Sequence, residues 1–134
     1  MNAVILLCFI MTAVEMNIRP EVIVDWENYH IPYFDECVEE TGVDPMIPRL
    51  MFRQVNLPDE EDFHCYMKCI FERNNWMTSD GEDINYETLA EAVHVTPELI
   101  ETCRTVADLE SEICRKVYLV TKCAVDDQIP SNDR

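Results

Sequence analysis

The chain has 134 residues, enough for one domain with a modest hydrophobic core. Its 27 acidic residues against 10 basic ones give a net charge of -17, which argues against nucleic acid and anionic membrane surfaces as partners. Only two glycines, Gly42 and Gly81, interrupt the sequence. Because tight turns between strands need such residues, this scarcity favours an all-α fold.

An apolar run near the N-terminus extends from Ala3 to Val14 and is broken only by Thr12. It is too short for a bilayer, which takes about 20 residues, but it has the length of the hydrophobic part of a secretory signal peptide. We therefore predict a signal peptide over 1–17, with cleavage anywhere in 13–19 because no Ala-x-Ala site marks it. The alternative is a buried N-terminal helix. A signal peptide implies a secreted, extracellular protein whose domain spans 18–134.

Six cysteines remain once Cys8 leaves with the signal peptide. An even number in an oxidising compartment predicts disulfides rather than free thiols. A zinc site needs two close pairs of ligands, and Cys65 with Cys69 is the one close cysteine pair in the sequence. A thioredoxin-like site needs Cys-x-x-Cys, which does not occur. We therefore predict no metal and no other cofactor.

The first part of the mature chain is predicted to form short helices. One helix begins near Pro20 and must end or bend at Pro32, since proline cannot continue the helical hydrogen bonds. A second piece runs from there to about Thr41, where Gly42 supplies the left-handed residue that closes a helix. A further short helix is predicted over about 44–52.

A long helix is predicted from Asp59, its N-cap, to Arg73, with acidic residues in the first turn. Apolar residues recur there at helical spacing and form one stripe: Phe63, Tyr66, Met67, Ile70 and Phe71. At 100° per residue, Cys65 and Cys69 lie on the flank of this helix, beside a polar sector that includes His64. We predict that each of these sulfurs ties the helix to a neighbour and that His64 has a solvated surface position.

A polar loop over 78–85 follows, and it lacks the first and third ligand positions of a calcium-binding EF-hand loop. Beyond it, a short helix starts near Asn85. Another helix begins with Thr96 as its cap and Pro97 at its first position.

The last helix is predicted over about 108–124. Within it Cys114 and Cys123 are nine residues apart, which is half a turn beyond two full turns, so their side chains point to opposite sides. A helix held from both sides must lie between two others. The tail after this helix has two apolar residues, Val125 and Ile129, and is predicted to form a short lid at most.

The cysteine spacing resembles that of the insect odorant-binding proteins, the pheromone and general odorant-binding family. Gaps of 27, 3, 33, 10 and 8 residues separate the six cysteines, and the C-x3-C and C-x8-C gaps are the specific part. The local sequences CVEETGV, DFHCYMKCIFE and CRKVYLVTKC agree with the resemblance. It covers the whole mature chain.

The resemblance implies an all-α fold: a compact six-helix domain with three interlocked disulfides around an apolar cavity. Six cysteines allow 15 connectivities, and the sequence alone does not choose among them. The pairing found in the family, carried over to this chain, joins Cys37 to Cys69, Cys65 to Cys114 and Cys103 to Cys123.

The candidate site is the wall of this cavity. Flexible methionines and flat aromatic rings suit ligands of imprecise shape, and several apolar positions near the cysteines match cavity-lining positions in relatives. Any one of these residues could instead fill a dry core. The predicted ligand-binding residues are Met51, Phe52, Met67, Ile70, Phe71, Trp76, Met77, Leu89, Val93, Ile100, Val117 and Val120.

The resemblance implies a secreted carrier that binds small hydrophobic ligands, such as odorants or pheromones, and delivers them through aqueous fluid. The expected partners are that ligand and an olfactory receptor, with no nucleic acid and no membrane insertion, and the protein is expected to be a monomer or a weak homodimer. No nucleophile, base and orienting residue form a recognisable set, so we do not predict an enzyme. The alternative is a secreted scavenging or protein-interaction protein that has the same fold and no olfactory role.

Overall fold

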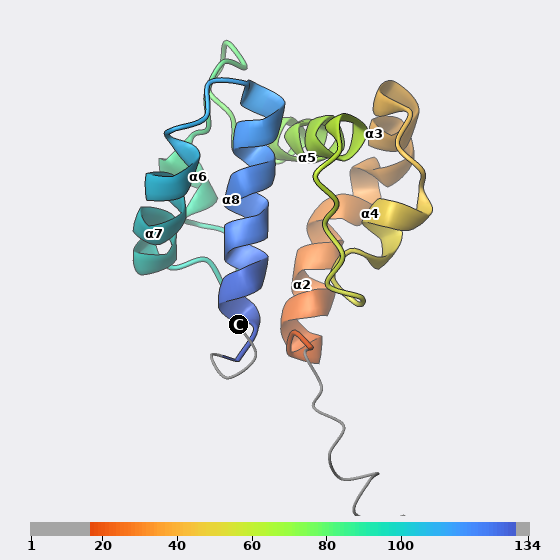
Figure 1. Cartoon of the computed structure of the whole chain (residues 1–134), viewed down its shortest axis with the longest axis horizontal. Coiled ribbons are helices and arrows are strands. Elements are labelled where there is room, and N and C mark those ends of the chain that lie inside the picture. Colours follow the sequence, from red (N-terminus) through yellow and green to blue (C-terminus); the bar gives the residue numbers. More distant parts are fainter. Residues whose placement is uncertain (1–16, 131–134) are drawn as a thin grey trace, which may run out of the picture.

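The computed structural model describes residues 17–130 of the chain (Figure 1). Those residues form α-helices and one 3-10 helix, and the described part contains no strand, only an isolated bridge between Met77 and Ile84. Three of the helical segments, α2 (Pro20–His30), η1 (Ile31–Tyr33) and α3 (Phe34–Thr41), follow one another without a gap and make one bent helix. Counted in this way, the described chain has six helical units, and the predicted all-α, six-helix fold is confirmed.

The bend after α2 lies where the sequence predicts it. Pro32 has no backbone N–H to donate, and the chain passes through a single 3-10 turn before α3 begins. α3 ends at Thr41, and Gly42 adopts a φ of 72°, the left-handed conformation that a residue with a Cβ rarely takes. The next helix, α4 (Met46–Leu50), is shorter than the predicted range of 44–52.

The long helix α5 (Glu61–Arg73) turns its apolar stripe into the core. Its buried residues include all five that the helical spacing predicts: Phe63, Tyr66, Met67, Ile70 and Phe71. The N-cap of this helix is Glu60 rather than the predicted Asp59, so the helix begins later than predicted. The side chain of Glu60 makes no capping hydrogen bond. The stripe therefore follows from the sequence more reliably than the exact start of the helix.

Asp59, the predicted cap of α5, has another role. Its carboxylate oxygens lie 2.7 Å from Nε2 of His64 and 3.2 Å from Nη2 of Arg115. His64 is only 6% exposed and its ring lies 4.3 Å, centroid to centroid, from that of Tyr118. The predicted surface position of His64 is therefore wrong, because α8 packs over the flank of α5 that carries it.

The remaining helices are α6 (Tyr86–Leu89), α7 (Pro97–Ala107) and α8 (Ile113–Gln128). The side chain of Thr96 accepts a backbone hydrogen bond at the start of α7, as predicted, and the side chain of Asn85 does the same at the start of α6. α8 begins at Ile113, later than the predicted 108. At this start the side chain of Glu112, the N-cap, accepts hydrogen bonds from two backbone N–H groups. It also extends beyond the predicted end at 124, because Val125 packs into the core and Lys122 pairs with Asp126 at 2.8 Å.

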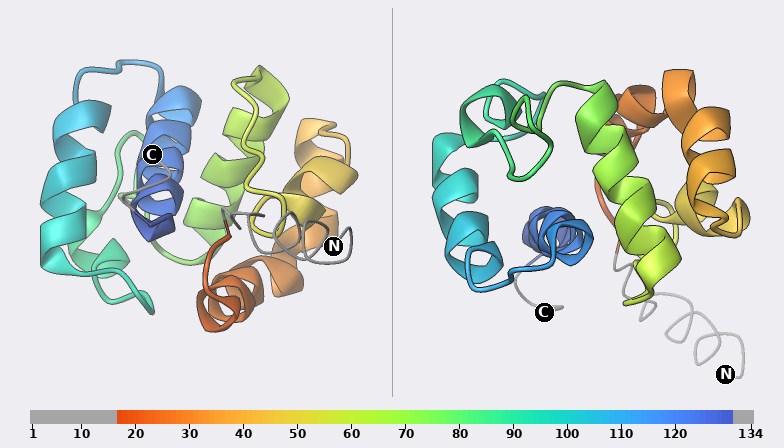
Figure 2. Two further views of the ribbon diagram at one scale, coloured as in Figure 1. Left: turned by 60° about the horizontal axis from the view of Figure 1, so that its bottom comes forward. Right: turned by 90° about the horizontal axis from the view of Figure 1, so that it is seen from above.

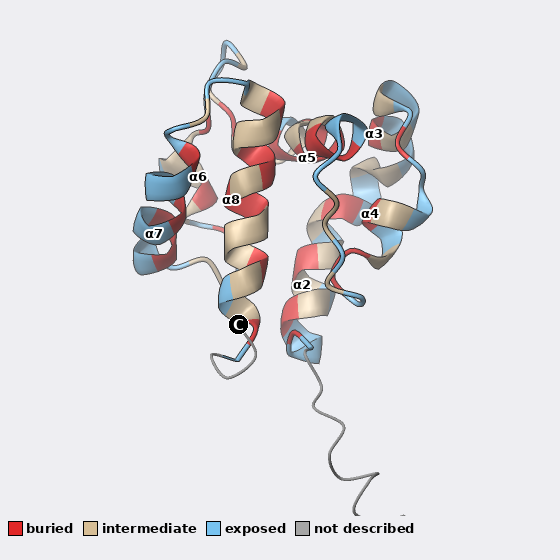
Figure 3. Cartoon of the chain, in the orientation of Figure 1, coloured by how far each residue is buried: buried red, intermediate tan, exposed pale blue. Residues whose placement is uncertain are grey.

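α8 lies between two other helices, as the opposed cysteines predict. It packs against α5 on one side and α7 on the other, and Figure 2 shows it end-on between them. α3 packs against α5 as well. In Figure 3 the buried residues of α2, α5 and α8 gather where these helices face one another, whereas the outer side of α7 is exposed. The core therefore sits among α2, α5 and α8, with α7 as an outer layer.

Three disulfides join these helices. Cys37 of α3 is bonded to Cys69 of α5, Cys65 of α5 to Cys114 of α8, and Cys103 of α7 to Cys123 of α8. These are the pairs that the resemblance implies. Because Cys65 and Cys69 connect α5 to different partners, α3, α5, α8 and α7 form one covalently linked series.

The predicted signal peptide falls almost entirely on residues 1–16, which lie outside the described residues. Ile18, at the start of the described chain, is buried in the core. None of the helices within 17–130 is both long enough and apolar enough to span a membrane.

Candidate functional site

A small cavity of about 70 Å³ lies among α2, α5, α7, α8 and the segment that joins α6 to α7. Each wall presents residues at helical spacing, so one face of every surrounding helix contributes. The lining residues are Trp26, Tyr29, His30, Phe52, Met67, Phe71, Trp76, Leu89, Ala92, Val95, Leu99, Ile100, Cys103, Val120, Thr121, Ala124 and Val125. Most of these side chains are apolar, so the cavity offers its occupant hydrophobic contact above all.

The structure brings seven of the twelve predicted residues to this cavity. They come from the loop before α5, from α5 itself, from the segments around α6, and from α7 and α8. These seven are Phe52, Met67, Phe71, Trp76, Leu89, Ile100 and Val120.

The other five predicted residues do not line it. Met51, Ile70 and Val117 are completely buried in the surrounding core, and Met77 is buried beside them. Ile70 faces away because it is 100° around α5 from Phe71. Val93 is 47% exposed, since α6 ends at Leu89 and Val93 lies in the turn that follows it.

Ten lining residues were not predicted. Three belong to α2, two to the turn between α6 and α7, two to α7 and three to α8: Trp26, Tyr29, His30, Ala92, Val95, Leu99, Cys103, Thr121, Ala124 and Val125. The i, i+3, i+4 spacing of the three α2 residues is a signal that could have found that wall. Ala124 and Val125 were missed because the last helix was predicted to end there. Instead of forming a short lid, this part of the chain continues α8 and closes the cavity.

Most polar side chains at the cavity wall form hydrogen bonds with backbone groups. Nε1 of Trp26 donates to the carbonyl oxygen of Val93 at 2.8 Å, and the hydroxyl of Tyr29 accepts from the Val93 N–H at 2.9 Å. The Thr121 hydroxyl donates to the carbonyl of Val117 at 3.0 Å. Because each of these side chains has a backbone partner, facing an apolar ligand costs less than it would for an unpaired polar group.

The same hydrogen bonds fasten the turn 92–95 to α2. A further contact joins His94, whose Nε2 lies 2.7 Å from Oδ2 of Asp25. His94 has a φ of 65°, in the left-handed region that is uncommon for residues other than glycine. The turn carries two lining residues, Ala92 and Val95, so α2 holds one wall of the cavity in place through three polar contacts.

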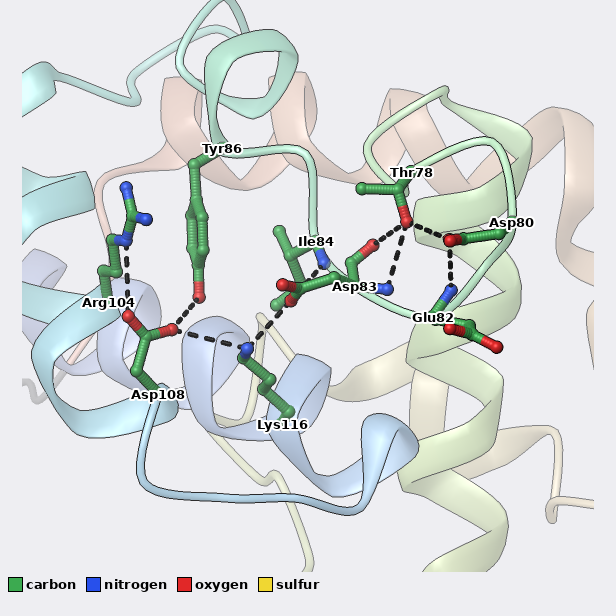
Figure 4. Close-up of polar contacts among 9 residues, drawn as sticks. All are labelled: Thr78, Asp80, Glu82, Asp83, Ile84, Tyr86, Arg104, Asp108 and Lys116. Carbon is green, nitrogen blue, oxygen red and sulfur yellow. Dashed lines mark hydrogen bonds and ion pairs between the residues drawn. The ribbon is translucent and has the colours of Figure 1, made fainter.

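A second network holds the opposite wall (Figure 4). Nζ of Lys116 on α8 lies 2.8 Å from Asp83 and 3.4 Å from Asp108. Asp108 also accepts from the Tyr86 hydroxyl at 3.3 Å and pairs with Arg104, whose guanidinium lies over the Tyr86 ring. The hydrogen bond from Lys116 lowers the pKa of Asp83. The network ties the start of α6 and the end of α7 to α8, and thereby positions Leu89 and Leu99.

His30 is the buried titratable group of the wall. Its Nδ1 lies 3.0 Å from the hydroxyl of Tyr66. Burial lowers the pKa of His30 from 6.5 to about 4, and burial also raises the pKa of Tyr66. At neutral pH the imidazole is therefore uncharged, and its Nδ1 can accept a hydrogen bond from the Tyr66 hydroxyl.

We expect the protein to lose stability as the pH falls from about 6.5 to about 4. In this window the unfolded state protonates His30 and the folded state does not, so protons favour unfolding. The loss should reach about 3 kcal/mol below pH 4 and be absent above pH 6.5. Urea unfolding across this range measures it. The double variant His30→Phe/Tyr66→Phe, which replaces both partners by rings of similar shape, should show a flatter profile between these limits; an unchanged profile would contradict the assignment.

One group of potential metal ligands occurs within the described residues, but its chemistry does not suit a metal. Ligand atoms of Cys37, Glu40 and Cys69 lie within 4.8 Å of one another. The two sulfurs are bonded to each other as a disulfide. Since thiolates rather than disulfide sulfurs bind metals, only the exposed carboxylate remains.

The fold and the cavity define a class: small helical domains that are closed by interlocked disulfides around an apolar space. A model of the PBP/GOBP family matches residues 29–127. The chain therefore belongs to the PBP/GOBP family of insect odorant-binding proteins, and the resemblance in its cysteine spacing is confirmed. This is a family of binding and carrier proteins rather than enzymes.

The fold is similar to that of a solved structure, Apis mellifera odorant binding protein 5. The TM-score is 0.57 at 18% sequence identity, and the match covers 84% of this chain and 93% of that one. At this identity the likeness extends to the arrangement of helices.

Proposed function

We propose that this protein is a secreted carrier that binds small hydrophobic molecules of the odorant or pheromone class in the cavity and carries them through extracellular fluid. The observation that supports this most directly is the wall itself, which is mainly apolar, includes Trp26 and Trp76, and bonds several of its polar groups to the backbone. Burial of ligand surface there yields about 25 cal/mol per Å². Three disulfides are consistent with an oxidising, extracellular setting. The buried position of Ile18 favours signal cleavage on its N-terminal side.

The cavity must enlarge to hold such a ligand. Its volume of about 70 Å³ is far below the roughly 300 to 1,000 Å³ of sites for small organic ligands. Micromolar affinity, about 8 kcal/mol, requires roughly ten to twenty heavy atoms at ordinary ligand efficiency. Met67 has a flexible side chain, and Trp76 is partly exposed, so both can move outward as a ligand enters.

The test is a displacement assay with a fluorescent naphthylamine probe and the oxidised, full mature protein. We expect probe fluorescence to rise on binding and to fall when aliphatic alcohols, esters or aldehydes of this size are added. Both tryptophans of the chain line the cavity, so their emission should change with occupancy as well. If the folded protein takes up no probe between about pH 5 and pH 8, the carrier proposal fails and a protein-interaction role on the same fold replaces it.

A further inference from the structure

A larger cleft lies next to the cavity. Its volume is about 350 Å³, and α2, η1, α3 and α4 surround it. Its apolar lining includes Ile31, Phe34 and Leu50, of which Ile31 is largely exposed. His30 and Phe52 border both spaces, and their rings meet edge to face with centroids 5.4 Å apart. These two rings therefore stand between the inner cavity and the outer cleft.

Two arginines, Arg49 and Arg53, border the outer cleft, and only Arg53 pairs with an acidic residue of the described chain. Arg53 forms two hydrogen bonds with Glu27, at 3.0 and 2.8 Å, so these two residues neutralise each other. Arg49 has no carboxylate oxygen within 4.0 Å among residues 17–130. Every other lysine and arginine in that range has one: Arg19, Arg53, Lys68, Arg73, Arg104, Arg115, Lys116 and Lys122.

Arg49 is held in position although it lacks an acidic partner. Its guanidinium lies 4.9 Å from the centroid of the Phe34 ring, and its Nη1 lies 3.9 Å from the sulfur of Met46. In a chain with a net charge of -17, an oriented arginine with no acidic partner at the border of a cleft is an exception. A guanidinium presents paired N–H donors that match a carboxylate.

We propose that the inner cavity and the outer cleft form one elongated site for an amphipathic carboxylate, a molecule with an apolar chain and one acidic head group. The chain passes His30 and Phe52 into the inner cavity, and the head group lies in the outer cleft on Arg49. This inference rests on the proposed carrier function and names the ligand class. It also relieves the volume problem, because the cleft alone reaches the size of a site for a small organic ligand.

The experiment compares decanoate with decanol, which share a chain length and differ in the head group. Near neutral pH, Arg49→Gln should weaken decanoate binding about tenfold, since a charge-assisted hydrogen bond is lost, and should leave decanol within about twofold. Arg19→Gln makes the same charge change at the opposite end of α2 and should affect neither ligand. Asp35→Asn removes the acid at the same cleft that, unlike Glu27, is not paired with Arg53, and it should tighten decanoate binding.

The dependence of decanoate binding on salt distinguishes attraction of the head group to Arg49 from repulsion by the net negative charge of the protein. Raising NaCl from about 20 to about 500 mM shortens the Debye length from about 20 to about 4 Å. If Arg49 holds the head group, decanoate binding weakens with salt; if only the net charge of the protein matters, it strengthens. Strengthening with salt, or an Arg49→Gln variant that binds decanoate as the parent does, overturns this inference and leaves the carrier function standing. Failure of both decanol and decanoate to bind overturns the carrier function itself.

Discussion

Reduction of the three disulfides is expected to unfold this protein. The bonded cysteines are 32, 49 and 20 residues apart. In the chain-entropy model, each bond raises the free energy of the unfolded state by about 3 to 4 kcal/mol, because it restricts the conformations of the unfolded chain. A domain of this size is stable by about 5 to 15 kcal/mol in total. Far-ultraviolet circular dichroism with and without reductant measures the effect. A reduced protein that keeps its helical signal and its cooperative unfolding would contradict the expectation.

Single bonds should rank by the loop that they enclose. The pair Cys65→Ser/Cys114→Ser opens the 49-residue loop and should cost about 4 kcal/mol. The pair Cys103→Ser/Cys123→Ser opens the 20-residue loop and should cost about 3 kcal/mol. Before these comparisons, mass spectrometry of the non-reduced mature protein should show the loss of six hydrogen atoms that three bonds require.

Phe71→Asp is expected to abolish ligand binding. Phe71 is 4% exposed, lines the cavity and meets the Trp76 ring edge to face at 5.2 Å. An aspartate there is a desolvated charge facing an apolar ligand, which costs several kcal/mol and hence at least about a hundredfold in affinity. The same probe displacement assay measures this loss.

Controls distinguish a damaged wall from a damaged fold. Leu109→Asp introduces the same charge at a position that is 89% exposed and away from the cavity, and it should bind as the parent does. Phe71→Leu keeps the wall apolar and should retain most of the affinity. If Phe71→Asp does not fold, Ala124→Leu fills the cavity without a charge and should weaken binding about tenfold. If a folded Phe71→Asp or Ala124→Leu variant keeps the parental affinity, the cavity is not the binding site.

The local sequence predicts those parts of the fold that depend on local rules. The stripe on α5, the bend at Pro32, the left-handed Gly42 and the cap at Thr96 all depend on residues within one or two turns. The position of α8 between two helices follows from geometry as well, because opposed cysteines on one helix need partners on both sides.

The parts that were missed depend on contacts between residues distant in the sequence. His64 follows acidic residues and looks solvated, yet the helix that buries it starts about fifty residues later. The wall formed by α2 and the turn 92–95 depends on hydrogen bonds between residues 64 or more positions apart. Met51 and Ile70 belong to the same apolar pattern as Phe52 and Phe71, and only the packing decides which of them borders the cavity.

Some parts of the domain resist deformation more than others, because the disulfides link some helices and not others. α3, α5, α8 and α7 are joined by covalent bonds, whereas α2 and the turn 92–95 contact each other through three side-chain hydrogen bonds. Stretching the covalent series would strain bonds, but parting α2 from the turn exchanges polar contacts for water at about 1 kcal/mol each. Swelling of the cavity is therefore cheapest on that side. Oxidative cross-linking gives the domain a rigid frame with one wall that deforms more easily, so resistance to unfolding and the capacity to change the cavity volume reside in different parts of the same small chain.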